Sequence, residues 1–247
     1  MISGMTRNSF SGGAIFIAVV IDIPQRFQVV NNLSPFGAGW RLLALMVCSP
    51  LGSGISGYLV SRIKMPAFYI FLVAAILQTI GLALMGTLSI SDSRVQLVQY
   101  GYQVILGLGI GLTLSSLLIA APTVIVEKDA GVLLSPLLYW LALTALAVFV
   151  GALTQARILG GSIGLAVCTN ILNDKVKSES TFLSPQQLHS LLQSAETINT
   201  LPANSQERVR QIYGTGYNKE MQALTAFGGA AVIATLLMWE KKLRRMQ

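Results

Sequence analysis

The chain has 247 residues, of which 53% are hydrophobic and only 11% are charged, and its mean hydropathy is +0.65. Because a soluble domain has about 25% charged residues, this composition argues against a cytosolic enzyme, a nucleic-acid-binding domain and a disordered chain. The formal net charge of +7 fits a membrane protein whose cytoplasmic loops carry the Lys and Arg residues. We therefore expect an all-α, polytopic membrane protein.

The residues that usually carry catalysis or bind metals are sparse. The sequence has two cysteines, Cys48 and Cys168, both within apolar runs, and one histidine, His189. It contains no Cys/His cluster at metal-ligand spacing, and no G-x-S-x-G, P-loop or H-E-x-x-H motif. We expect neither enzyme activity nor a metal or cofactor, and we expect both cysteines to pack as small hydrophobic residues.

Uncharged apolar runs define the expected membrane spans, since a helix needs about 20 residues to cross about 30 Å of hydrocarbon. In chain order, these runs cover residues 8–21, 42–61, 65–91, 95–126, 130–156, 158–173 and 221–239. The first run predicts a spanning helix over 9–22 that ends at Asp22. Residues 130–173 carry Arg157 as their only charge, and there we predict one span over 148–172, preceded by a re-entrant or interfacial helix over 132–145.

Basic residues set the expected orientation. The tail over 240–247 and the turn that contains Arg62 and Lys64 are predicted to be cytoplasmic, which is compatible with about six crossings and both termini inside. We expect transmembrane helices over 1–173, an extracytoplasmic loop with short helices over 174–220, a last transmembrane helix over 221–239 and a basic cytoplasmic tail over 240–247.

The loop over 174–220 contains one clear helix start. Ser184 is a good N-cap residue, and Pro185 follows it at the first helical position. The loop is either a solvated connection between two spans or a lid over a substrate path, and the sequence leaves both alternatives open.

Several segments resemble the fourteen-helix drug:proton antiporters of the major facilitator superfamily. The string DIPQRFQVV at 22–30, followed by SPFGAG at 34–39, is similar to the L-P-x-x-F-Q…S-P-x-x-A-G segment of that family. Further matches in the same order are SPLGSG at 49–54, YGYQ at 100–103, GLGIG at 107–111 and QARILGGSIG at 155–164. The resemblance is closest to fungal pumps that export toxins and drugs, and it covers only the carboxy-terminal portion of such a protein.

The resemblance implies a partial major-facilitator fold and the efflux of small organic compounds, drugs or toxic secondary metabolites, by proton antiport. The implied partners are membrane lipid, the small-molecule substrate, protons and an amino-terminal transporter half, with no nucleic acid. The implied location is the plasma membrane, or otherwise the vacuolar membrane. We expect this chain alone to be inactive; the alternative is a non-transporting membrane protein that acts only through helix–helix contacts. Residues 130–145 interrupt the family's pattern and are expected to be an aberrant insertion.

The candidate residues fall into three groups. Four polar side chains within the expected spans could line a substrate pathway: Arg157, Gln155, Gln103 and Gln78. The alternatives are that Arg157 reaches the cytoplasmic interface and that Gln103 and Gln78 form interhelical hydrogen bonds. Glycines at close spacing are expected to serve helix packing or act as hinges: Gly52, Gly57, Gly107, Gly111, Gly160 and Gly164. The cytoplasmic turn is marked by Arg62 and Lys64.

Acidic residues are expected to be absent from the middle of the spans, with Asp22 placed at a helix end. Proton coupling requires a titratable group that can be reached from both sides of the membrane. We therefore expect proton coupling to reside in the amino-terminal half.

Overall fold

The computed structural model describes residues 2–90, 95–129, 136–193 and 195–239, and these residues form helices and no strands. This confirms the expected all-α bundle. In chain order the helices are α1 (Ile2–Val29), α2 (Pro35–Arg41), α3 (Leu43–Ser61), α4 (Ala67–Met85), α5 (Val98–Asp129), α6 (Pro136–Glu179), α7 (Pro185–Gln193), the 3-10 helix η1 (Ala195–Thr200) and α8 (Ala203–Leu236).

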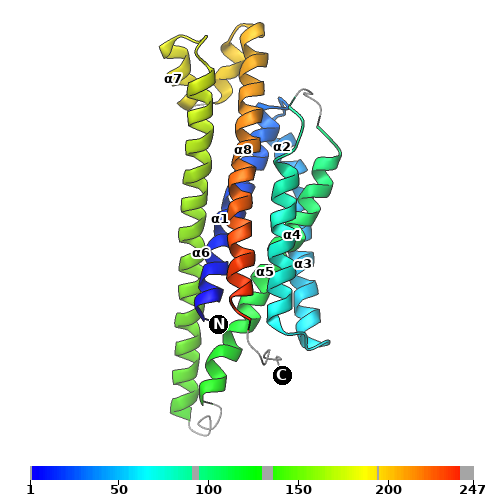
Figure 1. Ribbon diagram of the computed structural model, residues 1–247, viewed down its shortest axis with the longest axis vertical. Helices are drawn as coiled ribbons and strands as arrows, with labels where there is room; N and C mark the ends of the chain where they lie inside the picture. The colour runs from blue at the N-terminus through cyan, green and yellow to red at the C-terminus, as the bar shows by residue number, and fades with distance from the viewer. Residues whose placement is uncertain (1, 91–94, 130–135, 194, 240–247) are drawn as a thin grey trace.

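The long helices form two packed groups (Figure 1). Helix α1 packs against α6 and α8 in one group, and α5 packs against α3 and α4 in the other. The contact between α4 and α8 joins the groups. Four helices among the described residues are long and apolar enough to cross a membrane: Ser3–Val29, Pro35–Ser61, Ala67–Met85 and Leu143–Glu179.

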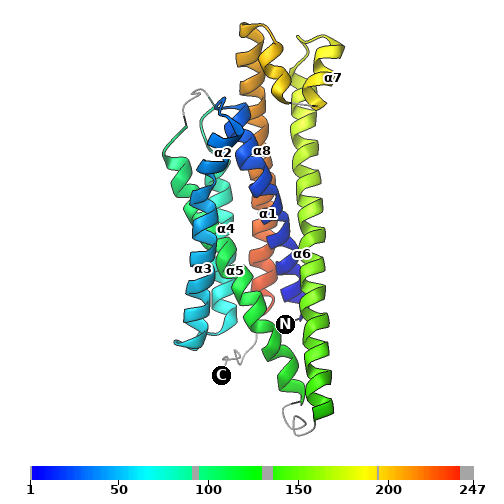
Figure 2. The same cartoon turned by 180° about the vertical axis from the view of Figure 1, so that it is seen from behind.

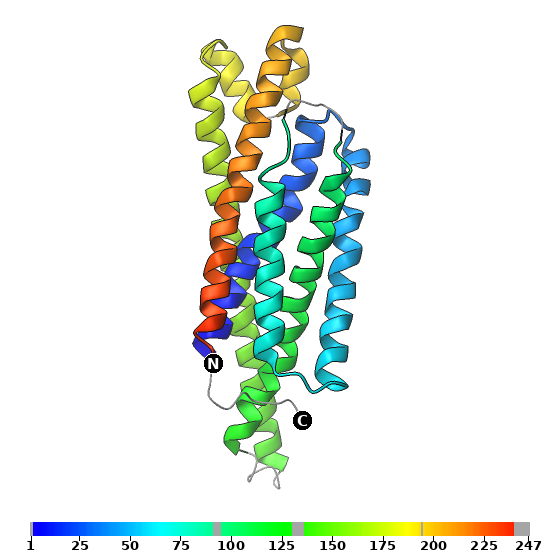
Figure 3. The same ribbon diagram turned by 45° about the vertical axis from the view of Figure 1, so that its right-hand side comes forward.

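The start of α1 and the end of α8 lie at the same end of the bundle (Figure 3). The turn between α3 and α4 lies at this end too, and its basic residues Arg62 and Lys64 are exposed. Helix α7 lies at the opposite end. This arrangement is the one that an even number of crossings produces, and the positive-inside rule makes the end with Arg62 and Lys64 the expected cytoplasmic end.

The bounds of α1 and α8 differ from the expected spans. Helix α1 does not end at Asp22 but continues to Val29, because Asp22 is buried against other helices and is not a solvated end. Helix α8 begins at Ala203, well before residue 221, because the polar segment that precedes the apolar run packs against α1, α6 and η1. The membrane placement of 174–220 stays a prediction.

Residues 136–145 form the first turns of α6, continuous with the expected span over 148–172. They are not a separate re-entrant helix, and residues 132–135 lie outside the described part of the chain. Pro136 is the first residue of α6, a position where proline is favoured because its missing N–H has no helical partner there. Whether 130–145 is an insertion remains a prediction.

Glycines allow two pairs of helices to cross at backbone contact. A Cβ atom at Gly111 of α5 would lie 1.9 Å from the carbonyl oxygen of Ser49 on α3. A Cβ atom at Gly160 of α6 would lie 2.0 Å from the carbonyl oxygen of Phe10 on α1. Close approach of this kind is typical of helix packing in membranes. The other predicted glycines at these two crossings are Gly52, Gly107 and Gly164.

Gly57 is the exception among the predicted packing glycines. A Cβ atom there would meet no atom within 4 Å among the described residues. Five residues separate it from Gly52, which turns it about 140° around α3 and away from α5. Gly57 therefore takes no part in the α3–α5 crossing.

Candidate functional site

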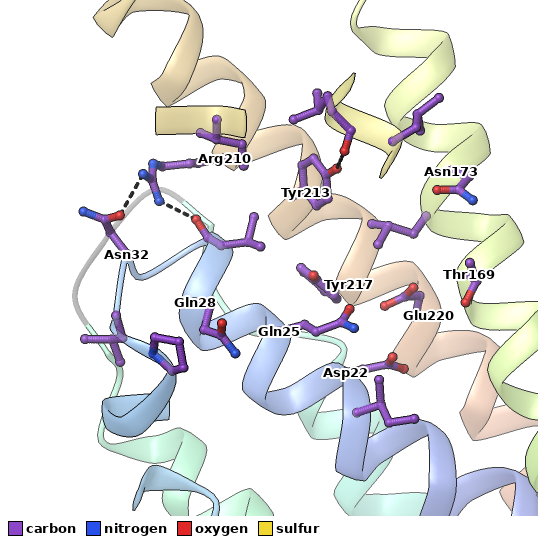
Figure 4. Close-up of a pocket in the computed structure, with 18 of the residues that line it drawn as sticks. Asp22, Gln25, Gln28, Asn32, Thr169, Asn173, Arg210, Tyr213, Tyr217 and Glu220 are labelled. Carbon is purple, nitrogen blue, oxygen red and sulfur yellow. Dashed lines mark hydrogen bonds between the residues drawn. The ribbon is translucent and has the colours of Figure 1, made fainter. Parts of the chain in front are cut away.

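A cavity of about 740 Å³ lies between α1, α6 and α8, at the end of the bundle that carries α7 (Figure 4). Figure 2 shows α7 beside the ends of α6 and α8 that extend past the other helices. Residues of α7 and η1 contribute to the cavity wall, as do residues at the α1–α2 connection. The polar residues that line the cavity are Asp22, Gln25, Gln28, Asn32, Ser34, Thr169, Asn173, Gln193, Asn199, Arg210, Tyr213, Tyr217 and Glu220.

Helix α7 begins at a capping box, and Leu191 holds it against the cavity wall. The Ser184 hydroxyl accepts a hydrogen bond from the Gln187 backbone N–H, and the Gln187 side chain accepts one from the Ser184 N–H. This reciprocal capping box begins α7 at Pro185, as the sequence predicted. Leu191 is buried, and its carbonyl oxygen accepts a hydrogen bond of 3.2 Å from the Tyr213 hydroxyl of α8.

Arg210 of α8 fastens the α1–α2 connection and η1 at the rim of the cavity. Its guanidinium donates to the carbonyl oxygen of Val29 at 2.6 Å, to Asn32 Oδ1 at 2.9 Å and to Asn199 Oδ1 at 3.1 Å. Asn32 has φ 53°, a left-handed conformation that asparagine tolerates better than most residues and that turns the chain after α1. The Arg210 guanidinium is therefore held at the rim by hydrogen bonds to these three acceptors.

The Arg210 contacts predict a local effect of substitution. In Arg210→Ala, the turn after α1 loses the two hydrogen bonds that Arg210 donates to it, and we expect amide hydrogen exchange over residues 29–34 to accelerate. Arg208→Ala is the matched control, because the Arg208 guanidinium lies 4.4 Å from the Phe182 ring instead. Hydrogen-exchange mass spectrometry checks this; equal exchange over 29–34 in the two variants would contradict the assigned role of Arg210.

Two carboxyl groups lie at the inner part of the cavity. Asp22 of α1 is 3% exposed and Glu220 of α8 is 1% exposed, and both line the cavity. Figure 4 shows the two carboxyl groups directed toward the same space from their two helices. Asp22 Oδ2 and Glu220 Oε2 have no hydrogen-bond partner among the described residues. The expectation that Asp22 lies at a helix end is therefore wrong, because it lies within α1 and is buried.

Among the described residues, no basic side chain forms an ion pair with either carboxyl group. Cys168 of α6 lies within hydrogen-bonding reach of Asp22, and the Tyr217 side chain of α8 is buried in the same cavity wall. Arg26, one turn after Asp22 on α1, is 5% exposed, but its guanidinium donates to Asn218 Oδ1 and to the Ser89 carbonyl oxygen. Its hydrogen bonds thus go to α8 and to the segment after α4.

The four polar residues predicted to line a pathway lie away from this cavity. Arg157 and Gln78 come together at a second, small cavity of about 10 Å³ inside the bundle. There the Arg157 guanidinium lies 4.8 Å from the centre of the Phe16 ring, and Gln78 Nε2 donates to the Gly109 carbonyl oxygen at 3.0 Å and to the Thr113 hydroxyl.

The other two glutamines have opposite environments. Gln103 is fully buried in α5, and neither atom of its amide has a hydrogen-bond partner among the described residues. Gln155 is exposed on α6. The structure thus brings only Arg157 and Gln78 together, and a pathway role for the four residues stays a prediction.

Sequence reasoning missed the residues of the large cavity because it counted charges as helix ends. Two signals were available. Asp22 is followed by IPQRFQVV without a glycine to end the helix. Glu220 follows Tyr213 and Tyr217 at spacings of seven and three, which place all three on one helix face.

An all-α bundle with membrane-length apolar helices and a polar cavity between them is the architecture of a polytopic membrane protein with a binding site. No protein-family model matches the chain. Its relatives are transporters by name. It is 39% identical over 245 residues to the MFS-type transporter FPY5 of Fusarium mangiferae, covering 99% of this chain and 38% of that protein.

Two further relatives are efflux proteins by name. The chain is 26% identical over 237 residues to the MFS-type efflux pump MFS1 of Trichophyton rubrum, covering 95% of the chain and 41% of the pump. It is 27% identical over 188 residues to the MFS thioclapurine efflux transporter tcpA of Claviceps purpurea, covering 76% of the chain and 31% of that transporter. The chain therefore belongs to the major facilitator superfamily and is an integral membrane protein of the transporter kind. It spans less than half the length of these relatives.

Proposed function

We propose that this chain forms the carboxy-terminal helix bundle of an efflux transporter, which exports small organic compounds in exchange for protons. The cavity between α1, α6 and α8 carries this proposal, because its volume of about 740 Å³ suits a drug-sized compound. Asp22 and Glu220 supply titratable groups at its inner part, so the proton site need not reside in an amino-terminal half. The efflux relatives support the direction of transport and the class of compound, drugs or toxic secondary metabolites.

The second bundle of such a transporter would come from an amino-terminal half. Major-facilitator transport uses two bundles that rock about a site between them, and this chain supplies six long helices within its described residues, enough for one such bundle. Alone, the chain has no partner against which to rock, and we propose that it does not transport by itself.

Co-expression tests both parts of this proposal. The chain would be produced in yeast cells that lack their own efflux pumps, alone and together with the amino-terminal part of the Fusarium mangiferae relative. We expect the cells to retain less of a fluorescent organic compound only when both parts are present, and we expect an uncoupler to abolish the difference.

A matched pair of variants tests the role of the acids in this assay. Asp22→Asn should remove proton-driven export, whereas Glu207→Gln, at an exposed position of α8, should retain it. Export by the chain alone would contradict the need for a second half, and export that resists the uncoupler would contradict proton antiport. Binding of the two parts without any export would favour the alternative, a protein that acts only through helix contacts.

The proposed orientation and location can be tested by cysteine labelling. In a background without Cys48 and Cys168, Gln187→Cys on α7 should react with an impermeant maleimide in intact cells, and Arg62→Cys should react only after the cells are opened. Both positions are exposed. The reverse pattern would contradict the orientation, and labelling of neither position in intact cells would contradict a plasma-membrane location.

A further inference from the structure

We propose that a groove between the start of α1, the middle of α6 and the end of α8 binds one anionic phospholipid, with an acyl chain in the groove and the phosphate beside Arg7. The groove is separate from the large polar cavity. It lies toward the end of the bundle where α1 begins and α8 ends, opposite α7 (Figure 3). The inference goes beyond transport, because it concerns the lipid that the chain selects from the membrane.

The first argument is the chemistry of the groove wall. The groove has a volume of about 600 Å³, and the residues of α6 and α8 that line it are all apolar. Its polar lining residues, Thr6, Arg7 and Ser11, all come from the first turns of α1. The groove therefore offers an apolar surface on two helices and polar groups on the third, which matches a molecule with an apolar tail and a polar head.

The second argument is that the groove opens to the outside of the bundle. Leu159 of α6 and Ile233 and Leu237 of α8 line it, and each of these side chains is more than half exposed. On a membrane-spanning helix, exposed apolar side chains meet acyl chains rather than water. A lipid can therefore enter the groove sideways from the bilayer.

The third argument is the depth of the groove. Trp239 follows the end of α8 and is 58% exposed, and tryptophan is enriched at the boundary between membrane and water. Along α8 the groove extends from Leu237 back to Phe227, which is about 15 Å of helix. Half of a hydrocarbon layer of about 30 Å has the same thickness. The groove thus has the length of one lipid leaflet.

The fourth argument is the charge at the mouth of the groove. Asn8 Nδ2 donates to Thr235 Oγ1 at 2.9 Å, so the neighbouring Arg7 lies about one helical turn below Trp239. Arg7 is exposed and is the only charged residue over 1–21.

Nothing acidic in the described structure neutralises Arg7. The only ion pair among the described residues joins Lys175 to Glu179, and no acidic residue is found among the described residues that line the groove. The sequence after α8 adds four basic residues over 241–245. An anionic headgroup is attracted to such a basic segment, whereas a zwitterionic headgroup carries its own ammonium group and gains less.

The test measures which lipid occupies the groove. Phenylalanine would replace Trp40, Trp140 and Trp239, and Ile233→Trp would put a single tryptophan in the groove wall. The chain would be placed in phosphatidylcholine vesicles with increasing fractions of brominated phosphatidylglycerol or brominated phosphatidylcholine, whose acyl chains quench tryptophan fluorescence on contact. We expect phosphatidylglycerol to reach half-maximal quenching at about one fifth of the fraction that phosphatidylcholine needs, as expected for one basic side chain beside an anionic headgroup.

Matched changes assign the preference to the groove and to Arg7. Val73→Trp in the same background puts the reporter on α4, at an exposed position outside the groove and at a similar distance from the same end of the bundle. We expect the two lipids to quench it equally. Arg7→Gln should abolish the preference at the Ile233→Trp reporter, whereas Arg62→Gln, in the exposed turn at the same end, should retain it.

Native mass spectrometry of the unaltered chain needs no substitution. In detergent with equal amounts of phosphatidylglycerol and phosphatidylcholine of the same acyl chains, we expect one phosphatidylglycerol to stay bound. Equal retention of the two lipids would overturn the inference even if no reporter variant folds.

The fluorescence results can overturn the inference as well. Equal quenching by the two lipids at the Ile233→Trp reporter would do so, as would the same preference at Val73→Trp or a preference that survives Arg7→Gln. Quenching by neither lipid would also overturn it, because a second copy of the chain would then cover the groove. None of these results depends on export, so they leave the proposed function to its own assay.

Discussion

Substitution of Gly160 by leucine is expected to prevent α1 and α6 from packing together. A Cβ atom at this position would lie 2.0 Å from the carbonyl oxygen of Phe10, which is backbone and cannot turn aside as a flexible side chain can. The two helices would have to separate along their crossing, where a Cβ atom at Gly13 would lie 1.9 Å and one at Gly164 2.7 Å from a carbonyl oxygen of the opposite helix. Even ordinary overpacking costs about 1–3 kcal/mol, and a clash with backbone should cost more.

Gly151→Leu is the matched control for this experiment. It lies on the same helix and adds the same apolar side chain, but a Cβ atom there meets no atom within 4 Å among the described residues. Size-exclusion chromatography and thermal unfolding in detergent would compare the variants with the unaltered chain. We expect Gly151→Leu to match the unaltered chain and Gly160→Leu to aggregate. A monodisperse Gly160→Leu variant with unchanged unfolding would contradict the α1–α6 crossing.

Replacement of Arg26 by methionine is expected to destabilise the contact between the two helix groups. The arginine is buried and links α1 to Asn218 of α8 and to Ser89 after α4. Hydrogen bonds to charged groups contribute about 1.5–3 kcal/mol each. Asn218 would lose the partner of its Oδ1 atom, although its Nδ2 atom would still donate to the Leu88 carbonyl oxygen at 2.7 Å.

Arg62→Met controls for the loss of an arginine, because Arg62 is exposed in the turn after α3. Unfolding in mixed detergent, followed by the loss of helical circular dichroism, would give the difference in free energy of unfolding. We expect a loss of about 2 kcal/mol or more for Arg26→Met and little change for Arg62→Met. Equal stability of the two variants would show that the Arg26 contacts contribute nothing.

The positions of the long helices could be predicted from the sequence because apolar runs report the length of chain that avoids water. The runs at 42–61 and 65–91 correspond to α3 and α4 with small shifts at their ends. The same reasoning failed at α1 and α8, whose polar residues lie against other helices. A run of uncharged residues detects contact with lipid, whereas contact between helices also tolerates Asp22, Arg26 and Glu220.

The cavity was harder to predict than the fold because its acids come from opposite ends of the chain. Nothing in the local sequence indicates that α1 and α8 pack side by side, and this contact brings Asp22 and Glu220 together. The glycine crossings could be predicted, because small residues at regular spacing on a membrane helix indicate close packing. Gly57 shows the limit of that rule, since its spacing of five residues from Gly52 places it on another face of α3.

The length of α6 has a mechanical consequence. Its 44 residues, at about 1.5 Å per residue, make a rod of about 66 Å, roughly twice the thickness of the hydrocarbon layer. A rod of this length acts as a lever: a tilt of about 5° about one end displaces the other end by about 6 Å. Because α7 follows directly at the end beside the cavity, a small rotation at the far end of α6 would be amplified into a change in the width of the cavity entrance.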